Sequence, residues 1–125
     1  MNTKILMTSS TIVMATIGLV CSFMPDEVLT YFGIKEFIVL PLIIQVLGST
    51  YLGFAILNWM AKSNLIGGIY SKPVVIGNFM HYAVSSLALV KFFMAHTDLK
   101  LILIPLGIYV IFALLFGKVM FSSPV

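Results

Sequence analysis

Four long apolar segments dominate this sequence, and each is long enough to cross a lipid bilayer as a helix. They cover residues 5–24, 37–60, 74–94 and 99–120, and a membrane-spanning helix needs about 20 mostly apolar residues. The connections between them are short, so consecutive segments are expected to run antiparallel. The sequence therefore predicts an all-α integral membrane protein, in which residues 1–125 form a single up-down-up-down four-helix bundle.

The composition indicates that lipid is the main solvent of the protein surface. Charged residues make up only 9% of the chain, whereas soluble domains usually contain about 25%. The seven basic residues are all lysines and are spread singly along the sequence. Because a nucleic-acid-binding protein needs basic residues clustered on one face, we expect membrane lipids among the partners and no nucleic acid.

The lysines between and beside the segments predict the orientation of the protein in the membrane. Lys4, Lys62, Lys72 and Lys118 fall on one side, and all acidic residues fall on the other side together with Lys35 and Lys100. Lysine-rich loops usually face the cytoplasm. Both termini of this multi-pass protein are therefore predicted to be cytoplasmic.

The first segment carries small residues at helical spacings of three and four. This helix-packing seam consists of Thr8, Thr11, Ala15, Gly18 and Ser22. Small residues let two helix backbones approach closely within a membrane. The seam is interpreted either as an interface with a partner chain or as packing within the protein's own bundle, and the second interpretation is preferred.

Polar side chains also lie near the middle of the second and third segments. With a rise of about 1.5 Å per residue, antiparallel helices bring several of them to similar depths. The members of this predicted polar cluster are Gln45, Tyr51, Asn58, Asn78, His81 and Tyr82. An unpaired polar group in hydrocarbon costs several kcal/mol, so these side chains are expected to face other helices or a cavity.

His81 has two interpretations that the sequence leaves open. An ionisable residue inside the membrane is a candidate functional residue, but a histidine can also tie helices together through hydrogen bonds. His96 is too far along the same helix to share one haem with His81, and no carboxylate or thiolate lies at the depth of His81. We therefore predict no metal site, no catalytic residue and no enzyme, and at most a non-catalytic subunit of an oxidoreductase complex.

Short motifs recur in a recognisable order along the chain. Pro25 and Tyr31-Phe32-Gly33 follow the first segment, the second contains Leu47-Gly48 and Tyr51-Leu52-Gly53, and the third contains a histidine. This order resembles the DoxX-like group, which comprises small four-helix bacterial membrane proteins. Characterised members are accessory subunits of membrane oxidoreductases. The resemblance implies a partner role in the cytoplasmic (inner) membrane of a bacterium and supplies no catalytic residue.

Two functions are expected from these features. The first is that of an accessory or scaffolding subunit in a larger membrane assembly, with other membrane subunits or a second copy of the chain as partner. The alternative is a binding or transport module for a small molecule, in which the predicted polar cluster around His81 holds a quinone or a lipid. No cofactor is expected apart from such a quinone or bound lipid.

Overall fold

The computed structural model describes residues 2–35, 38–64 and 71–122, and it is built from helices throughout these ranges. The elements in chain order are α1 (Thr3–Phe23), α2 (Pro25–Tyr31), α3 (Leu40–Ala61), α4 (Lys72–Ala95), the short 3-10 helix η2 (Lys100–Ile102) and α5 (Leu103–Phe121). Four helical stretches are long and apolar enough to cross a membrane, namely α1, α3, α4 and η2 continued by α5. The prediction of an all-α protein with four spanning helices is therefore confirmed.

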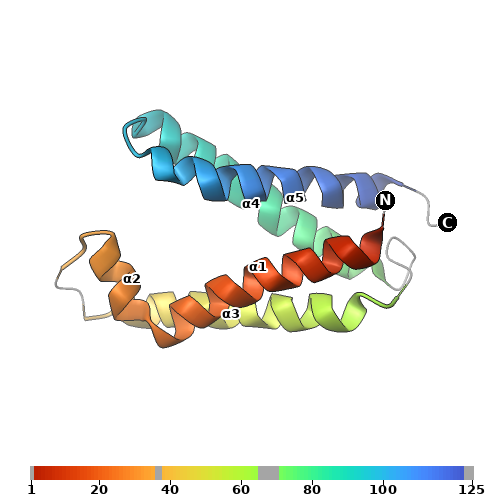
Figure 1. Cartoon of the computed structure of the whole chain (residues 1–125), viewed down its shortest axis with the longest axis horizontal. Coiled ribbons are helices and arrows are strands. Elements are labelled where there is room, and N and C mark those ends of the chain that lie inside the picture. Colours follow the sequence, from red (N-terminus) through yellow and green to blue (C-terminus); the bar gives the residue numbers. More distant parts are fainter. Residues whose placement is uncertain (1, 36–37, 65–70, 123–125) are drawn as a thin grey trace. The chain divides into compact units, whose positions relative to one another are not determined.

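Contacts divide the chain into two compact units, Met1–Lys62 and Ser63–Val125, which we call the first and second hairpin. In the first hairpin α1 packs along α3, and α2 contacts both of them. In the second hairpin α4 packs along α5 (Figure 1). The prediction that the whole chain is one domain stays a prediction.

The starts of the spanning helices follow from local sequence. The side chain of Asn2 accepts hydrogen bonds from the backbone nitrogens of Lys4 and Ile5 at the start of α1, which satisfies donors that the helix itself leaves open. Helices α3 and α4 each carry a proline in their first two positions, where the missing N–H has no helical acceptor to lose. The second predicted span starts at Phe37, which lies outside the described residues, whereas α3 begins at Leu40.

The short helix α2 has well-defined ends. Pro25 stands at its start and Asp26 and Glu27 lie in its first turn, where acidic side chains interact favourably with the helix dipole. At its end Gly33 adopts a left-handed conformation with φ of 73°. The nitrogen of Gly33 donates to the oxygen of Thr30 and the nitrogen of Ile34 donates to the oxygen of Leu29. These two bonds form a Schellman motif, so the glycine is needed to stop the helix at this point.

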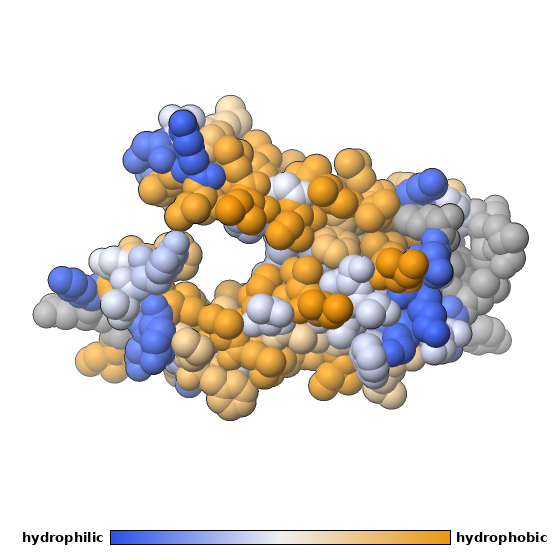
Figure 2. Space-filling model, viewed as in Figure 1, coloured by the Kyte–Doolittle hydropathy of each residue, from blue (hydrophilic) through white to orange (hydrophobic). Residues whose placement is uncertain are grey.

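The surface of each hairpin is what a lipid environment requires. Figure 2 shows apolar side chains over the lengths of the helices and hydrophilic side chains gathered at their ends. Large apolar residues are exposed on all four spanning helices, for example Ile12, Ile56, Leu87 and Leu114. In water such a surface would drive aggregation. With the four spans, it identifies a small multi-pass membrane protein.

Candidate functional site

The first hairpin brings α1 and α3 close together at two glycines. A β-carbon added at Gly48 would lie 2.7 Å from the backbone nitrogen of Ser22 and 2.9 Å from the backbone oxygen of Gly18. A β-carbon added at Gly18 would lie 2.8 Å from Cγ of Leu52. Glycine at both positions therefore permits the approach of the two backbones, as in other closely packed membrane helices.

Thr11 adds a polar contact to the same face. Its Oγ1 donates to the backbone oxygen of Met7 at 2.9 Å and lies 3.3 Å from the backbone oxygen of Ala55 on α3. The Oγ of Ser22 is buried and has no hydrogen-bond partner among the described residues. Thr11, Gly18 and Ser22 of the predicted seam thus contact α3, which corresponds to packing within the chain.

The other two seam residues lie at the edge of this contact. Thr8 donates from Oγ1 to the backbone oxygen of Lys4 at 2.8 Å, within α1, and Ala15 is half-buried. The fully buried positions of α1 are Leu6, Met7, Ser10, Thr11, Met14 and Gly18. The buried face is therefore broader than a stripe of small residues, because methionine side chains fill the space that the small residues leave.

Asn58 is buried in the first hairpin and hydrogen-bonds to α1. Its Nδ2 donates to Oγ of Ser10 at 3.0 Å and lies 3.7 Å from Sδ of Met14. Sequence reasoning placed Asn58 in the polar cluster without identifying Ser10 or Met14 as its neighbours. Their spacing of four residues on α1 is the signal that could have revealed a polar and polarisable row facing α3.

Two further members of the predicted polar cluster also belong to the first hairpin. Gln45 is exposed, and its Nε2 lies 3.5 Å from the backbone oxygen of Ser22. Tyr51 is half-buried on α3. Tyr51 and Asn58 are seven residues apart, or two turns, and therefore share one face of α3, whereas Gln45 lies on another face.

In the second hairpin, His81 pairs with a tyrosine of α5. His81 Nε2 lies 3.3 Å from the hydroxyl oxygen of Tyr109, and the ring centroids are 5.4 Å apart. Either group can donate this hydrogen bond, depending on the histidine tautomer. The predicted polar cluster does not include Tyr109, because its members come only from the second and third apolar segments, whereas Tyr109 lies in the fourth.

Tyr82 is the centre of the aromatic packing between α4 and α5. Its side chain is fully buried, and its ring packs edge-to-face on Tyr109 and stacks with Phe112 and Phe116. Asn78 is also fully buried, and its Nδ2 donates to the backbone oxygen of Val74 at 2.8 Å. Both side chains therefore point away from lipid, as the cost of burying polar groups in hydrocarbon predicts.

The structure thus groups the predicted polar cluster in two parts. Gln45, Tyr51 and Asn58 belong to the first hairpin, and Asn78, His81 and Tyr82 belong to the second. Each part makes hydrogen bonds within its own hairpin. That the two parts join in one site stays a prediction.

One face of α3 carries exposed polar and small residues, of which Gln45 still contacts α1 through its bond to Ser22. Gln45, Ser49 and Gly53 follow one another at intervals of four residues and are all exposed; we call them the outward row. A β-carbon added at Gly53 would meet no atom within 4 Å. Ser49 Oγ donates to the backbone oxygen of Val46 at 2.6 Å within the same helix, and both Ser49 and Gly53 are exposed.

Lys4 and Lys62 lie at one end of the first hairpin, and the acidic residues of α2 lie at the other end, where Lys35 follows α2. Lys62 Nζ lies 2.8 Å from the centroid of the Trp59 ring, in a cation–π contact. Desolvation, with a smaller contribution from the positive charge of Lys4, lowers the pKa of Lys62. Asp26 and Glu27 lie at the other end, in α2. This separation of charge is the one on which the predicted orientation rests.

Within residues 2–35, 38–64 and 71–122, no three His, Cys, Asp or Glu side chains gather where they could hold a metal ion. Polar groups inside the spans include the imidazole of His81, the hydroxyl of Tyr109 and the amides of Asn58 and Asn78. They can bind or orient a polar group.

Comparisons with known proteins identify no relative of this chain. No family model, no curated protein and no solved structure matches it. The resemblance to the DoxX-like group therefore stays a prediction from the short motifs alone.

Proposed function

We propose that this protein is an accessory or scaffolding subunit of a larger assembly in the bacterial cytoplasmic membrane, and that a partner helix packs on the outward row of α3. The observation that supports this proposal is the exposure of Gln45, Ser49 and Gly53 on a spanning helix. These residues lie within the length of α3 that is apolar enough to cross the membrane.

Contact with lipid would be unfavourable for the polar side chains of the outward row. The Gln45 amide is exposed and its hydrogen bond to Ser22 is long, at 3.5 Å; a polar group that faces hydrocarbon without a good partner costs free energy. A helix that packs on Gly53 would instead gain close backbone contact and could accept hydrogen bonds from the amide. The proposal therefore assigns the row to a protein neighbour.

The test fills the outward row without disturbing the hairpin. Gly53→Leu adds a side chain where the chain itself has no atom within 4 Å of the β-carbon. We expect wild-type protein, purified in a mild detergent, to elute in an assembly larger than the monomer. We expect Gly53→Leu to shift it to the monomer position, with unchanged helix content.

Gly107→Leu is the matched control, because a β-carbon at Gly107 on α5 also meets no atom within 4 Å. This variant should retain the wild-type assembly. A photocrosslinking residue at position 49 should also join the chain to a second polypeptide. Wild-type protein that runs as a stable monomer, or a Gly53→Leu variant that keeps the full assembly, would contradict the proposal.

A second candidate function is the binding of a quinone or lipid head group by the second hairpin. It is favoured by the pair of His81 and Tyr109, whose polar atoms are 3.3 Å apart, since the group that accepts the bond between them keeps its own hydrogen, which it can donate to a carbonyl. His81 is only half-buried, so its ring is accessible from one side. The pair would then orient the head group while the acyl or isoprenoid tail remains among lipids.

Extraction of purified protein with organic solvent tests this candidate. Wild-type protein should release a stoichiometric quinone or a defined lipid, and His81→Leu and Tyr109→Phe should each lower its amount. Ser85→Ala, one turn from His81 on the same helix, serves as the control. Equal amounts of lipid in all variants and no quinone in the wild type would refute this second function.

A further inference from the structure

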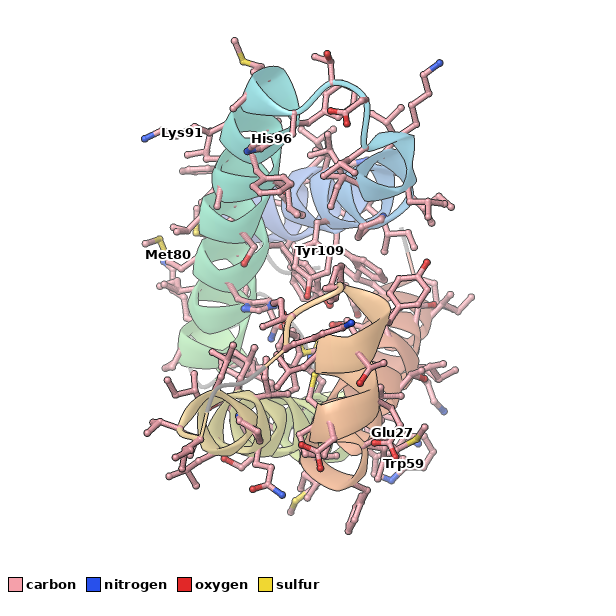
Figure 3. The ribbon with its side chains drawn as sticks, turned by 90° about the vertical axis from the view of Figure 1, so that its left-hand side faces the viewer. Glu27, Trp59, Met80, Lys91, His96 and Tyr109 are labelled. Atoms are coloured by element: carbon pink, nitrogen blue, oxygen red, sulfur yellow. The ribbon has the colours of Figure 1, made fainter. Side chains whose placement is uncertain are left out.

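The orientation of α2 suggests a membrane contact that differs from that of the spanning helices. Figure 3 shows α2 from the side, whereas α3 of the same hairpin is seen nearly along its axis. Because α3 is long and apolar enough to cross the membrane, a helix that runs across its axis lies along the membrane plane. A short helix in that position is at the level of the lipid headgroups.

Several contacts hold α2 in this orientation. Pro25 and Leu29 are buried, and α2 contacts both α1 and α3. The Schellman motif at Gly33 ends the helix, and the nitrogen of Ile34 bonds back to the oxygen of Leu29. This helix is therefore a fixed part of the first hairpin.

The residues at the end of α2 form an exposed aromatic surface. Tyr31 is 72% exposed and Phe32 is 65% exposed, and their rings make an edge-to-face contact with centroids 5.5 Å apart. Phe23, at the end of α1, is also exposed. Tyrosine is enriched at the level of the headgroups in membrane proteins.

The negative charge of α2 favours some lipid headgroups over others. Asp26 and Glu27 are exposed, and no residue of α2 is basic. Carboxylates attract the ammonium groups of zwitterionic headgroups and repel anionic headgroups. The complementary surface is therefore a bilayer rich in zwitterionic lipid.

We infer that α2 is an in-plane anchor, which sets the depth of the first hairpin by inserting Tyr31 and Phe32 among zwitterionic lipid headgroups. This assignment is independent of the proposed partner of α3, because it uses neither the outward row nor the second hairpin. It predicts where a fluorescent side chain at position 31 lies relative to the bilayer.

Tryptophan quenching in phosphatidylcholine vesicles tests this depth. In a Trp59→Phe background, Tyr31→Trp introduces one tryptophan into α2, and Ile12→Trp introduces one at an exposed position inside α1. Bromine placed near the glycerol end of the acyl chains should quench the Tyr31→Trp protein at least twice as strongly as bromine placed near the chain ends. The order should be reversed for the Ile12→Trp protein.

Two other results would overturn the assignment. Quenching of the Tyr31→Trp protein by aqueous iodide, with no quenching by either brominated lipid, would place α2 in water. Protection of its indole from both iodide and brominated lipid would place α2 against protein. Phe32→Trp provides a second reporter if Tyr31→Trp does not fold, and the same outcomes apply to it.

The lipid preference has its own readout. In vesicles that mix phosphatidylcholine with phosphatidylglycerol, brominated phosphatidylcholine should quench the Tyr31→Trp protein more than brominated phosphatidylglycerol does. The double substitution Asp26→Lys and Glu27→Lys should reverse this order. Equal quenching by the two lipids in both proteins would contradict the role of the carboxylates.

Discussion

Asn58 joins the two long helices of the first hairpin through a hydrogen bond that is shielded from lipid. Its side chain has no exposed surface, and the acceptor at 3.0 Å is the hydroxyl of Ser10. Interhelical hydrogen bonds in membranes contribute about 0.6 kcal/mol on average and about 1.7 kcal/mol at most. Because this contribution is small, the main effect of the Ser10–Asn58 bond is to fix the register of α1 and α3.

A double-mutant cycle measures this bond. Ser10→Ala, Asn58→Ala and the double variant should give a coupling free energy of about 0.6–1.7 kcal/mol in detergent unfolding. Thr16→Ala is the control, because the Thr16 hydroxyl is exposed and bonds only to the oxygen of Ile12 in its own helix. A coupling of zero would mean that the bond does not stabilise the hairpin.

Tyr82 has the corresponding role in the second hairpin. It contacts three aromatic rings of α5, and each aromatic pair contributes about 0.5–1.5 kcal/mol beyond its buried area. Tyr82→Leu should therefore lower the unfolding free energy by on the order of 2 kcal/mol. The matched variant Met80→Leu changes an exposed residue of the same helix and should have an effect within about 0.5 kcal/mol.

At the level of single residues, the burial expected for the polar cluster is found for some of its members, whereas Gln45 is exposed. Asn58, Asn78 and Tyr82 are fully buried, as the cost of polar groups in hydrocarbon requires. Depth along a helix does not specify rotation about its axis, however. The partners Ser10 and Tyr109 depend on that rotation, so the predicted cluster missed both.

Among the elements, α1 and α3 depend on glycine for their close contact. A β-carbon at Gly48 would meet backbone atoms of Ser22 and Gly18 at 2.7 and 2.9 Å, and backbone atoms cannot move aside as a flexible side chain can. The contact is thus sensitive to the addition of one methyl group.

Alanine at Gly48 should force the two helices apart. We expect Gly48→Ala to destabilise the first hairpin by on the order of 1–3 kcal/mol, as overpacking does in other well-packed contacts. Gly53→Ala is matched in chemistry and lies on the same helix, but its β-carbon meets no atom within 4 Å. If the two variants unfold at the same denaturant concentration, the close approach of α1 and α3 is wrong.

The spanning helices could be predicted from the sequence because about 20 apolar residues in a row have few alternatives. The helix α2 could not be delimited in this way, since its 7 residues are too few for a periodic pattern. Its end depends on the φ of 73° at Gly33, and a glycine in a loop does not reveal whether it takes that conformation.

For the whole molecule, the distribution of charge predicts the topology. Within the first hairpin Lys4 and Lys62 interact at one end, and Asp26 and Glu27 lie in α2 at the other. If basic ends face the cytoplasm, α2 and the turn between α4 and α5 face away from it.

Cysteine labelling in intact cells tests this topology. In a Cys21→Ala background, single cysteines in place of Thr30 and Asp98 should react with a membrane-impermeant maleimide before lysis. A cysteine in place of Ser63 should react only after lysis. All three positions are exposed, so accessibility does not distinguish them. Labelling of Ser63→Cys in intact cells, with protection of the other two, would reverse the orientation.

The acceptor for the Asn58 amide has a consequence for biosynthesis. Ser10 precedes Asn58 in the chain and belongs to α1, so the bond can form once α3 has entered the bilayer and requires neither α4 nor α5. The first half of the protein can therefore leave the insertion machinery with this amide already satisfied. A nascent chain arrested with α3 in the bilayer, but before α4 has been inserted, should already hold the Ser10 and Asn58 helices as a stable pair.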